Sequence, residues 1–389
     1  MARFLRRIAL MTSLSLCFLL LPKAALAAPL EDAPPMNLTA PGAILLEAET
    51  GAVIFEKNAD EERPVASVTK LMTLLLILEK LESGQITLED QVTVSEYAAG
   101  QSGSQAFLDA HAVYPLKDLL KATIISSGND SAVTLAEYVA GTEEAFVSLM
   151  NEKAEEMELL NTHYVNCTGL PAENQYTTAR DVGMISREIC RYPDYFSYSS
   201  TWLDSLTHPS GRVTDLTNTN RLVRFYQDCD GLKTGSTNEA KYCLSATAER
   251  KGMRLIAVVL GVPNSQTRFD EARAMMEYGF ANYARVQVAA QGDLIGAKIP
   301  VKMGSREEVD VALGSGLGML LKNGQAGKLG FETQLPEFLQ APVEKGQEIG
   351  MIRVLLGEEI VAQLPAVAAE NVRLPGMLEG FHRLLENWK

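Results

Sequence analysis

The 389-residue chain carries 35 Lys and Arg against 49 Asp and Glu, a formal net charge of −14 at pH 7. So acidic a chain lacks the positive surface that nucleic acids require, and no nucleic-acid partner is expected. Its five cysteines form no CxxC pair and none of its four histidines pairs with another at i, i+4 spacing. We therefore expect neither a metal centre nor a cofactor.

The first 27 residues have the pattern of a secretory signal peptide. It begins with the basic residues Arg3, Arg6 and Arg7, continues with an apolar run at 8–21, and ends with Ala-Leu-Ala at 25–27. The run of about 14 residues is shorter than the ~20 that a membrane-spanning helix needs, so we expect cleavage after Ala27. Cleavage removes four bases and no acids, which lowers the net charge from −14 to −18.

The hydrophobic pattern predicts two folded domains after a short leader at 28–36. In residues 37–285, helical patterns alternate with short apolar strands, which indicates a mixed α/β domain. In residues 286–374, short apolar runs are separated by glycines, which indicates a small all-β domain. The expected helices are 71–81, 132–140 and 145–159, and the expected strands are 42–47, 52–56, 242–248, 254–260, 297–301, 308–313, 317–321, 348–356 and 360–364.

The last segment, 375–389, has the pattern of a short amphipathic helix. Its apolar residues recur at helical spacing, with charged residues opposite: Met377, Leu378, Phe381, Leu384, Leu385 and Trp388 against Glu379, His382, Arg383 and Glu386. We predict that this helix lies in the interface of a membrane. The alternative is a helix that packs on its own β domain.

Ser67 and Lys70 are the first candidate catalytic pair. They precede a strongly apolar helical pattern and are three residues apart, so on a helix the lysine amine would lie one turn from the serine hydroxyl. Lysine can take the proton of a serine nucleophile if burial or nearby cations lower its pKa. A Ser-x-x-Lys sequence is common, however, and by itself more often describes a helix cap followed by a surface lysine.

Two further segments carry polar groups suited to the same chemistry. Ser127-Gly128-Asn129 follows an apolar helical run, and its hydroxyl could relay a proton while the Asn129 amide binds a substrate carbonyl. In Lys233-Thr234-Gly235, the glycine allows a substrate backbone to approach a sheet edge, while the lysine and threonine suit a carboxylate. Taken alone, the first segment is better explained as an ordinary loop between helices that includes a helix cap, and the alternative for the second is a solvated turn.

Taken in order, the three segments resemble the motifs of the low-molecular-mass penicillin-binding D-alanyl-D-alanine carboxypeptidases. Further similarity lies in 166–170, 176–181, Arg268-Phe269 and 278–280. The resemblance covers about residues 37–285 well and the β domain loosely. It implies the mixed α/β penicillin-binding and β-lactamase-like transpeptidase fold for the first domain.

The resemblance also implies a mechanism and partners. Ser67 would attack the penultimate D-Ala carbonyl of a peptidoglycan stem peptide, Lys70 would accept its proton, and Ser127 would pass a proton to the leaving amine. The backbone N–H groups of Ser67 and Ser236 would form the oxyanion hole. Substrate binding would involve Asn129, Lys233, Thr234, Gly235, Ser236 and Arg268. A β-lactam would acylate the same serine. The protein would be exported and would act at the outer face of the cytoplasmic membrane or in the cell wall.

Three other functions compete with this one. A Ser-His-Asp hydrolase is disfavoured because the chain has no G-x-S-x-G elbow. A β-lactamase shares two of the motifs but needs an added base for fast deacylation, and the glutamates near 155–161 have the wrong spacing to Asn161. A non-catalytic β-lactam or muropeptide sensor remains the alternative from a different class.

Overall fold

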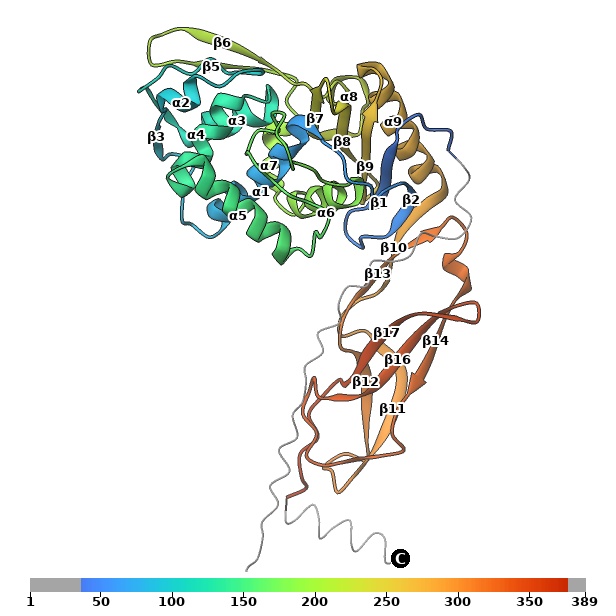
Figure 1. Ribbon diagram of the computed structural model, residues 1–389. Helices are drawn as coiled ribbons and strands as arrows, with labels where there is room; N and C mark the ends of the chain where they lie inside the picture. The colour runs from blue at the N-terminus through green and yellow to red at the C-terminus, as the bar shows by residue number, and fades with distance from the viewer. Residues whose placement is uncertain (1–35, 377–389) are drawn as a thin grey trace, which may run out of the picture.

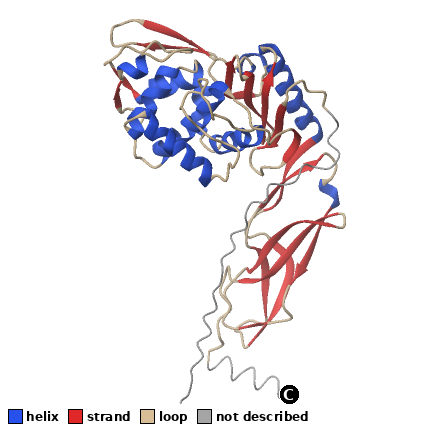
Figure 2. Cartoon of the chain, viewed as in Figure 1, coloured by secondary structure: helices blue, strands red, loops and turns tan. Residues whose placement is uncertain are grey.

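The computed structural model describes residues 36–376 and shows two bodies joined end to end (Figure 1). The predicted fold class is confirmed for these residues: helices surround a sheet in the first domain, and strands build almost all of the second (Figure 2). The predicted signal peptide and positions 377–389 of the predicted terminal helix lie outside the described residues. No helix within 36–376 is both long and apolar enough to cross a membrane.

A five-stranded antiparallel sheet forms the centre of the first domain, in the order β2-β1-β9-β8-β7. Its strands are β1 (Gly42–Glu47), β2 (Val53–Lys57), β7 (Cys229–Thr237), β8 (Lys241–Arg250) and β9 (Met253–Val262). β7 is an edge strand of this sheet. This position leaves one side of its backbone free of any neighbouring strand in the described part of the chain.

Both faces of the sheet are buried, which explains why β1 and β9 are apolar apart from Glu47 and Arg254. Alternate side chains of a strand point to opposite faces, so Ile44 joins a core beneath α1 and α6 while Leu45 joins a second core beneath α9. Ile256 and Ala257 of β9 divide between the two cores in the same way. The sheet therefore lies between two helical layers, and its edge opens at the side of the helical lobe.

The helical lobe lies between β2 and β7 in the chain. It contains η1 (Ala66–Thr69), α1 (Lys70–Glu82), α2 (Glu96–Ala99), α3 (Leu116–Ile125), α4 (Asn129–Ala140), α5 (Glu143–Glu156), α6 (Ala179–Ile189), α7 (Pro193–Ser199) and α8 (Leu222–Phe225), with the strand pairs β3 (Gln91–Thr93) and β4 (Val113–Pro115), and β5 (Leu203–Thr207) and β6 (Val213–Thr217). α1 is buried along most of its length because it runs through the middle of this lobe. α9 (Ser265–Asn282) covers the far face of the sheet (Figure 1).

The second domain begins directly where α9 ends. A two-stranded ribbon of β10 (Tyr283–Ala289) and β13 (Leu317–Lys322) joins it to the first domain. A six-stranded sheet follows in the order β14-β16-β17-β12-β11-β15, from β11 (Leu294–Lys302), β12 (Glu308–Leu313), β14 (Leu329–Gln334), β15 (Leu339–Gln340), β16 (Glu348–Leu356) and β17 (Glu359–Ala368), with the turn η2 (Ala326–Lys328). Its core is small and aliphatic, with Val309, Val311, Ile352 and Val354 fully buried.

Candidate active site

Ser67 lies on the 3-10 turn η1, which leads directly into α1 at Lys70. Because the two residues are three positions apart, their side chains share one face, and Lys70 Nζ is hydrogen-bonded to Ser67 Oγ at 2.9 Å. Ala66 has a φ of +50°, a left-handed conformation that is unfavourable for a residue with a Cβ. The serine is thus presented by a strained turn at the start of a buried helix.

Lys70 is fully buried and its amine has three hydrogen-bond partners. Besides Ser67 Oγ, these are Asn129 Oδ1 at 2.6 Å and the Thr168 backbone carbonyl at 2.8 Å. Burial lowers the pKa of Lys70 to about 7, because desolvation disfavours the charged amine more than Cys167 and Asp130 favour it. The amine is therefore substantially neutral at neutral pH, the form that accepts a proton from serine.

Two glycines allow other segments to press against the serine turn. A Cβ on Gly235 of β7 would lie 2.4 Å from Val65 O, and a Cβ on Gly169 would lie 1.9 Å from Ala66 O. Both distances are far below van der Waals contact, so only glycine fits. The close approach brings β7 to one side of Ser67 and the loop that carries the Thr168 carbonyl to the other.

Ser127 and Lys233 form the second pair of the site. Lys233 lies on β7, is almost fully buried, and donates a hydrogen bond to Ser127 Oγ at 2.7 Å. Burial, and then the charges of Lys70 and Arg268, hold the pKa of Lys233 well below its ordinary value. Ser127 has a φ of +64° in the turn between α3 and α4, a strained backbone of the kind that gathers at functional sites.

Asn129, the first residue of α4, connects Lys70 to the loop 100–112. Its Oδ1 accepts from Lys70, while its Nδ2 donates to Ser102 O at 2.5 Å and its backbone N–H donates to Ser104 O at 2.7 Å. This loop, for which the sequence suggested no role, therefore orients the Asn129 amide.

The other predicted substrate-binding groups lie along the edge strand β7. Thr234 Oγ1 donates to Thr219 Oγ1 at 2.7 Å, and Ser236 is exposed. A Cβ on Gly235 would also lie 2.9 Å from Ser67 N, so the backbone of β7 runs beside that of the serine turn. This arrangement places the two backbone N–H groups predicted for an oxyanion hole on adjoining segments.

Arg268 lies on α9, behind β7. It is largely buried, and its Nη1 donates to Gly235 O at 3.1 Å and to Cys243 O at 3.3 Å. Desolvation lowers the pKa of Arg268 to about 10, so the group remains a cation at neutral pH. Nη1 thus bonds to the backbone of β7 and of its neighbour β8, while Nη2 donates to Ser265 Oγ at 3.2 Å.

Three residues of the site had no role in the sequence prediction. Thr168 supplies the carbonyl bound to Lys70, and Asn166 Oδ1 accepts from the backbone N–H groups of Thr168 and Gly169, at 3.2 and 2.7 Å. Thr219 accepts from Thr234. The segment 166–170 was noticeable as a family-like stretch, whereas the position of Thr219 has no recognisable sequence pattern.

The arrangement suits acyl transfer. A serine hydroxyl lies beside an amine that is about half neutral at pH 7, a second serine lies beside a second lysine, and the backbone of β7 adjoins that of Ser67. The hydrogen bonds connect Ser67, Lys70 and Asn129 into one group and Ser127 and Lys233 into another. Residues suited to act as a nucleophile, a base and a proton relay therefore lie together at the edge of the sheet.

Comparisons with known proteins agree with this geometry. The family model of D-alanyl-D-alanine carboxypeptidases, peptidase family S11, matches residues 28–264, and that of the penicillin-binding protein 5 C-terminal domain matches residues 283–373. The chain is 37% identical over 350 residues to D-alanyl-D-alanine carboxypeptidase DacF of Bacillus subtilis, covering 90% of both chains. It is 32% identical over 391 residues to DacC of Escherichia coli, covering 95% of both.

Solved structures show the same architecture over both domains. Penicillin-binding protein 5 of Haemophilus influenzae superposes with a TM-score of 0.77 at 31% identity, covering 88% of this chain and all of that one. Penicillin-binding protein 6B of Escherichia coli gives a TM-score of 0.72 at 29% identity, covering 87% and 98%. The chain belongs to the S11 family of serine-type D-alanyl-D-alanine carboxypeptidases.

Proposed function

We propose that this protein removes the terminal D-Ala from peptidoglycan stem pentapeptides through an acyl-enzyme on Ser67. The observation that carries the proposal is the hydrogen bond of 2.9 Å between Ser67 Oγ and a fully buried Lys70. A lysine with a pKa of about 7 is half neutral at pH 7, and it needs no histidine to activate the serine.

In the proposed reaction, Lys70 takes the proton of Ser67 as Oγ attacks the carbonyl of the penultimate D-Ala. The backbone N–H groups of Ser67 and Ser236 stabilise the negative oxygen, a contribution of about 10²–10³ in rate for one donor in comparable enzymes. Ser127, hydrogen-bonded to Lys233, delivers its proton to the nitrogen of the departing D-Ala, and the proton that Lys70 took from Ser67 replaces it. Water then cleaves the ester, and Ser67 regains its proton.

The substrate is held as an added strand along β7, beside Gly235, with the Asn129 amide bonded to a backbone carbonyl. The free carboxylate of the terminal D-Ala lies toward Thr234, within the positive field of Lys233 and Arg268. A β-lactam presents a strained amide and a carboxylate to the same groups, so it acylates Ser67 and blocks the serine site.

Incubation of the mature protein with a peptide ending in D-Ala-D-Ala tests the proposal, with mass spectrometry to follow both the peptide and the protein. We expect the peptide to lose one alanine and penicillin to add one covalent adduct, with both results absent in Ser67→Ala. A penicillin adduct that persists in Ser67→Ala would show that another residue is the nucleophile.

The placement of the protein in the cell is also a proposal. Cleavage after Ala27 would export a chain whose catalytic domain spans residues 37–285 and whose β domain spans residues 286–374. The helix predicted at 375–389 would attach it to the outer face of the cytoplasmic membrane, where newly made stem peptides are within reach. Support comes from the family, whose substrate lies outside the cytoplasm, and from the apolar pattern of the terminal segment.

A further inference from the structure

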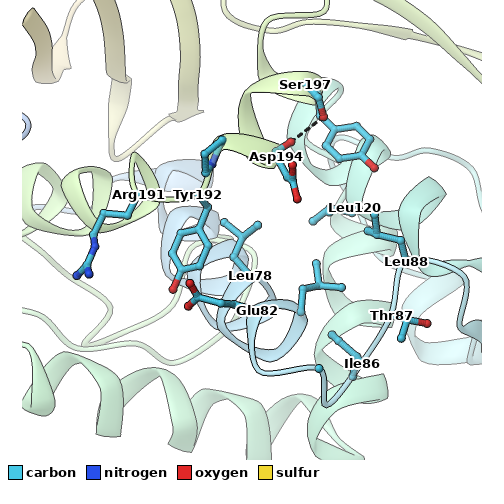
Figure 3. Close-up of a pocket in the computed structure, with 14 residues that line it drawn as sticks. Leu78, Glu82, Ile86, Thr87, Leu88, Leu120, Arg191, Tyr192, Asp194 and Ser197 are labelled. Carbon is cyan, nitrogen blue, oxygen red and sulfur yellow. Dashed lines mark hydrogen bonds between the residues drawn. The ribbon is translucent and has the colours of Figure 1, made fainter. Parts of the chain in front are cut away.

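A cavity of about 550 Å³ lies between the C-terminal end of α1 and the helix α7 (Figure 3). The cavity is lined by α1 from Leu78 to Glu82, so at 1.5 Å per residue it lies roughly 12–18 Å along the helix from Lys70. Its lining includes none of the residues of the serine site. The proposed carboxypeptidase reaction therefore makes no use of it.

The floor and walls of the cavity are apolar. Leu78, Leu88 and Leu120 face the empty space, with the side chains of Tyr192 and Tyr198 also in the lining (Figure 3). The volume lies in the range of pockets that hold small molecules, about 300–1,000 Å³. Apolar walls of this kind favour a ligand with a hydrocarbon body.

The rim of the cavity is negatively charged. Asp194 points into the space, whereas Arg191, the only base among the described residues of the lining, points away and is hydrogen-bonded to Glu188 at 3.0 Å (Figure 3). An adjoining hollow shares Glu82, Arg191 and Tyr192 with the cavity. Together the two hollows have five carboxylates and two basic groups, a net charge of −3, from Glu79, Glu82, Glu156, Glu188 and Asp194 against Lys153 and Arg191.

Two further features of the cavity favour a ligand that carries positive charge. The C-terminal end of α1 lies at the cavity, and the end of a helix where carbonyls are exposed carries partial negative charge. Burial and the neighbouring Glu82 and Glu79 raise the pKa of Tyr192 to about 12. Its phenol is therefore neutral, and its ring can contact an ammonium group.

We propose that this cavity is a second ligand site, which binds a small organic cation made of an ammonium group on an apolar body. The ammonium group lies beside Asp194, and the apolar body lies against Leu78, Leu88 and Leu120. The preference is opposite to that of the serine site, where Lys233 and Arg268 favour an anion. The two sites therefore take chemically different ligands.

A matched pair of probes tests the charge preference: 2-phenylethylammonium and the uncharged 2-phenylethanol, which share one apolar body. Isothermal titration of the mature protein should show millimolar or tighter binding of the ammonium probe, with at least about tenfold weaker binding of the alcohol. Asp194→Asn should remove most of that difference. Asp215→Asn, the same change at an exposed position of β6 outside the cavity lining, should leave it intact.

A variant that blocks the cavity and a protein acylated on Ser67 together show where the probe binds. Ser197→Phe, at an exposed lining position, introduces a ring over the cavity without a change of charge and should block both probes. Acylation of Ser67 by penicillin should leave the ammonium affinity unchanged. Equal affinities for the two probes, an unchanged affinity in Asp194→Asn, or loss of binding after acylation would each overturn the proposal.

Discussion

A buried lysine can accept a proton only while its amine is uncharged, so the pKa of Lys70 sets the pH range of the reaction. With that pKa at about 7, the neutral fraction falls about tenfold per pH unit below 7 and is nearly complete above 8. The acylation rate of Ser67 by a β-lactam should follow the same curve. Stopped-flow acylation across pH 5 to 9 measures it, and a flat profile would exclude Lys70 as the base.

Lys70→Arg isolates the proton transfer from the positive charge. Arginine keeps a cation near Ser67 but cannot give up a proton in this pH range, so acylation should fall by about 10²–10⁴. Labelling with fluorescent penicillin, together with the melting temperature, distinguishes a catalytic loss from a folding loss. Acylation at the wild-type rate in a folded Lys70→Arg protein would contradict the proposed role.

The cationic groups near β7 predict a requirement for a free carboxylate on the substrate. Amidation of the terminal D-Ala would leave Lys233 and Arg268 without that partner, at a cost of about 2–5 kcal/mol in comparable buried sites, or a factor of tens to thousands in rate. Comparison of kcat/KM for the acid and the amide measures the effect. Equal values would argue against carboxylate recognition by Lys233, Thr234 and Arg268.

Among the elements, the loop that carries Thr168 depends on a glycine. Gly169 has a φ of +81°, and a Cβ there would lie 1.9 Å from Ala66 O, inside the serine turn. Gly169→Ala should therefore reduce acylation by at least about tenfold and destabilise the fold by about 2–4 kcal/mol. Acylation kinetics and chemical denaturation measure the two effects.

Gly141 provides the matched control for this substitution. It has a φ of +85° at the end of α4, and a Cβ added there would have open space for 4 Å around it. Gly141→Ala should lower the free energy of unfolding by only about 1–2 kcal/mol, the cost of a left-handed backbone at a residue with a Cβ. Its acylation rate should be normal. If both variants behave alike, the contact between the loop and the serine turn has no functional importance.

Local patterns were sufficient to predict some elements and insufficient for others. The expected helix 71–81 corresponds to α1 (Lys70–Glu82), and the expected strand 42–47 to β1, because both have long apolar patterns. β7 was not identified as a strand, since Cys229–Thr237 contains few apolar residues and two glycines. β14 was missed for a similar reason, because most of its side chains are exposed.

The site was predictable where its residues are neighbours in sequence. Ser67 and Lys70 form their hydrogen bond within one turn, so their spacing alone indicated the contact. The bond between Ser127 and Lys233 joins positions 106 apart, and only the resemblance placed them together. The segment 166–170 resembled the family, but the role of the Thr168 carbonyl could not be predicted, because a backbone acceptor has no side-chain signature.

For the whole molecule, the terminal segment predicts attachment to a membrane surface. Its apolar stripe could contribute several kcal/mol at about 25 cal/mol per Å² of buried apolar area, and attachment should resist high salt because the segment has few bases. Truncation after Leu374 should abolish flotation with liposomes while soluble peptides are still cleaved. If both forms float equally, or neither floats, residues 375–389 do not bind membranes.

The junction between the two domains has a consequence for how the protein unfolds. β10 follows α9 without a linker, and Tyr283 of β10 and Leu320 of β13 are buried in the core beneath α9. Unfolding of the β domain would take both side chains out of that core, so the domains should be thermodynamically coupled. Calorimetry should show that a chain ending at Asn282 melts several degrees below the same domain within the full protein.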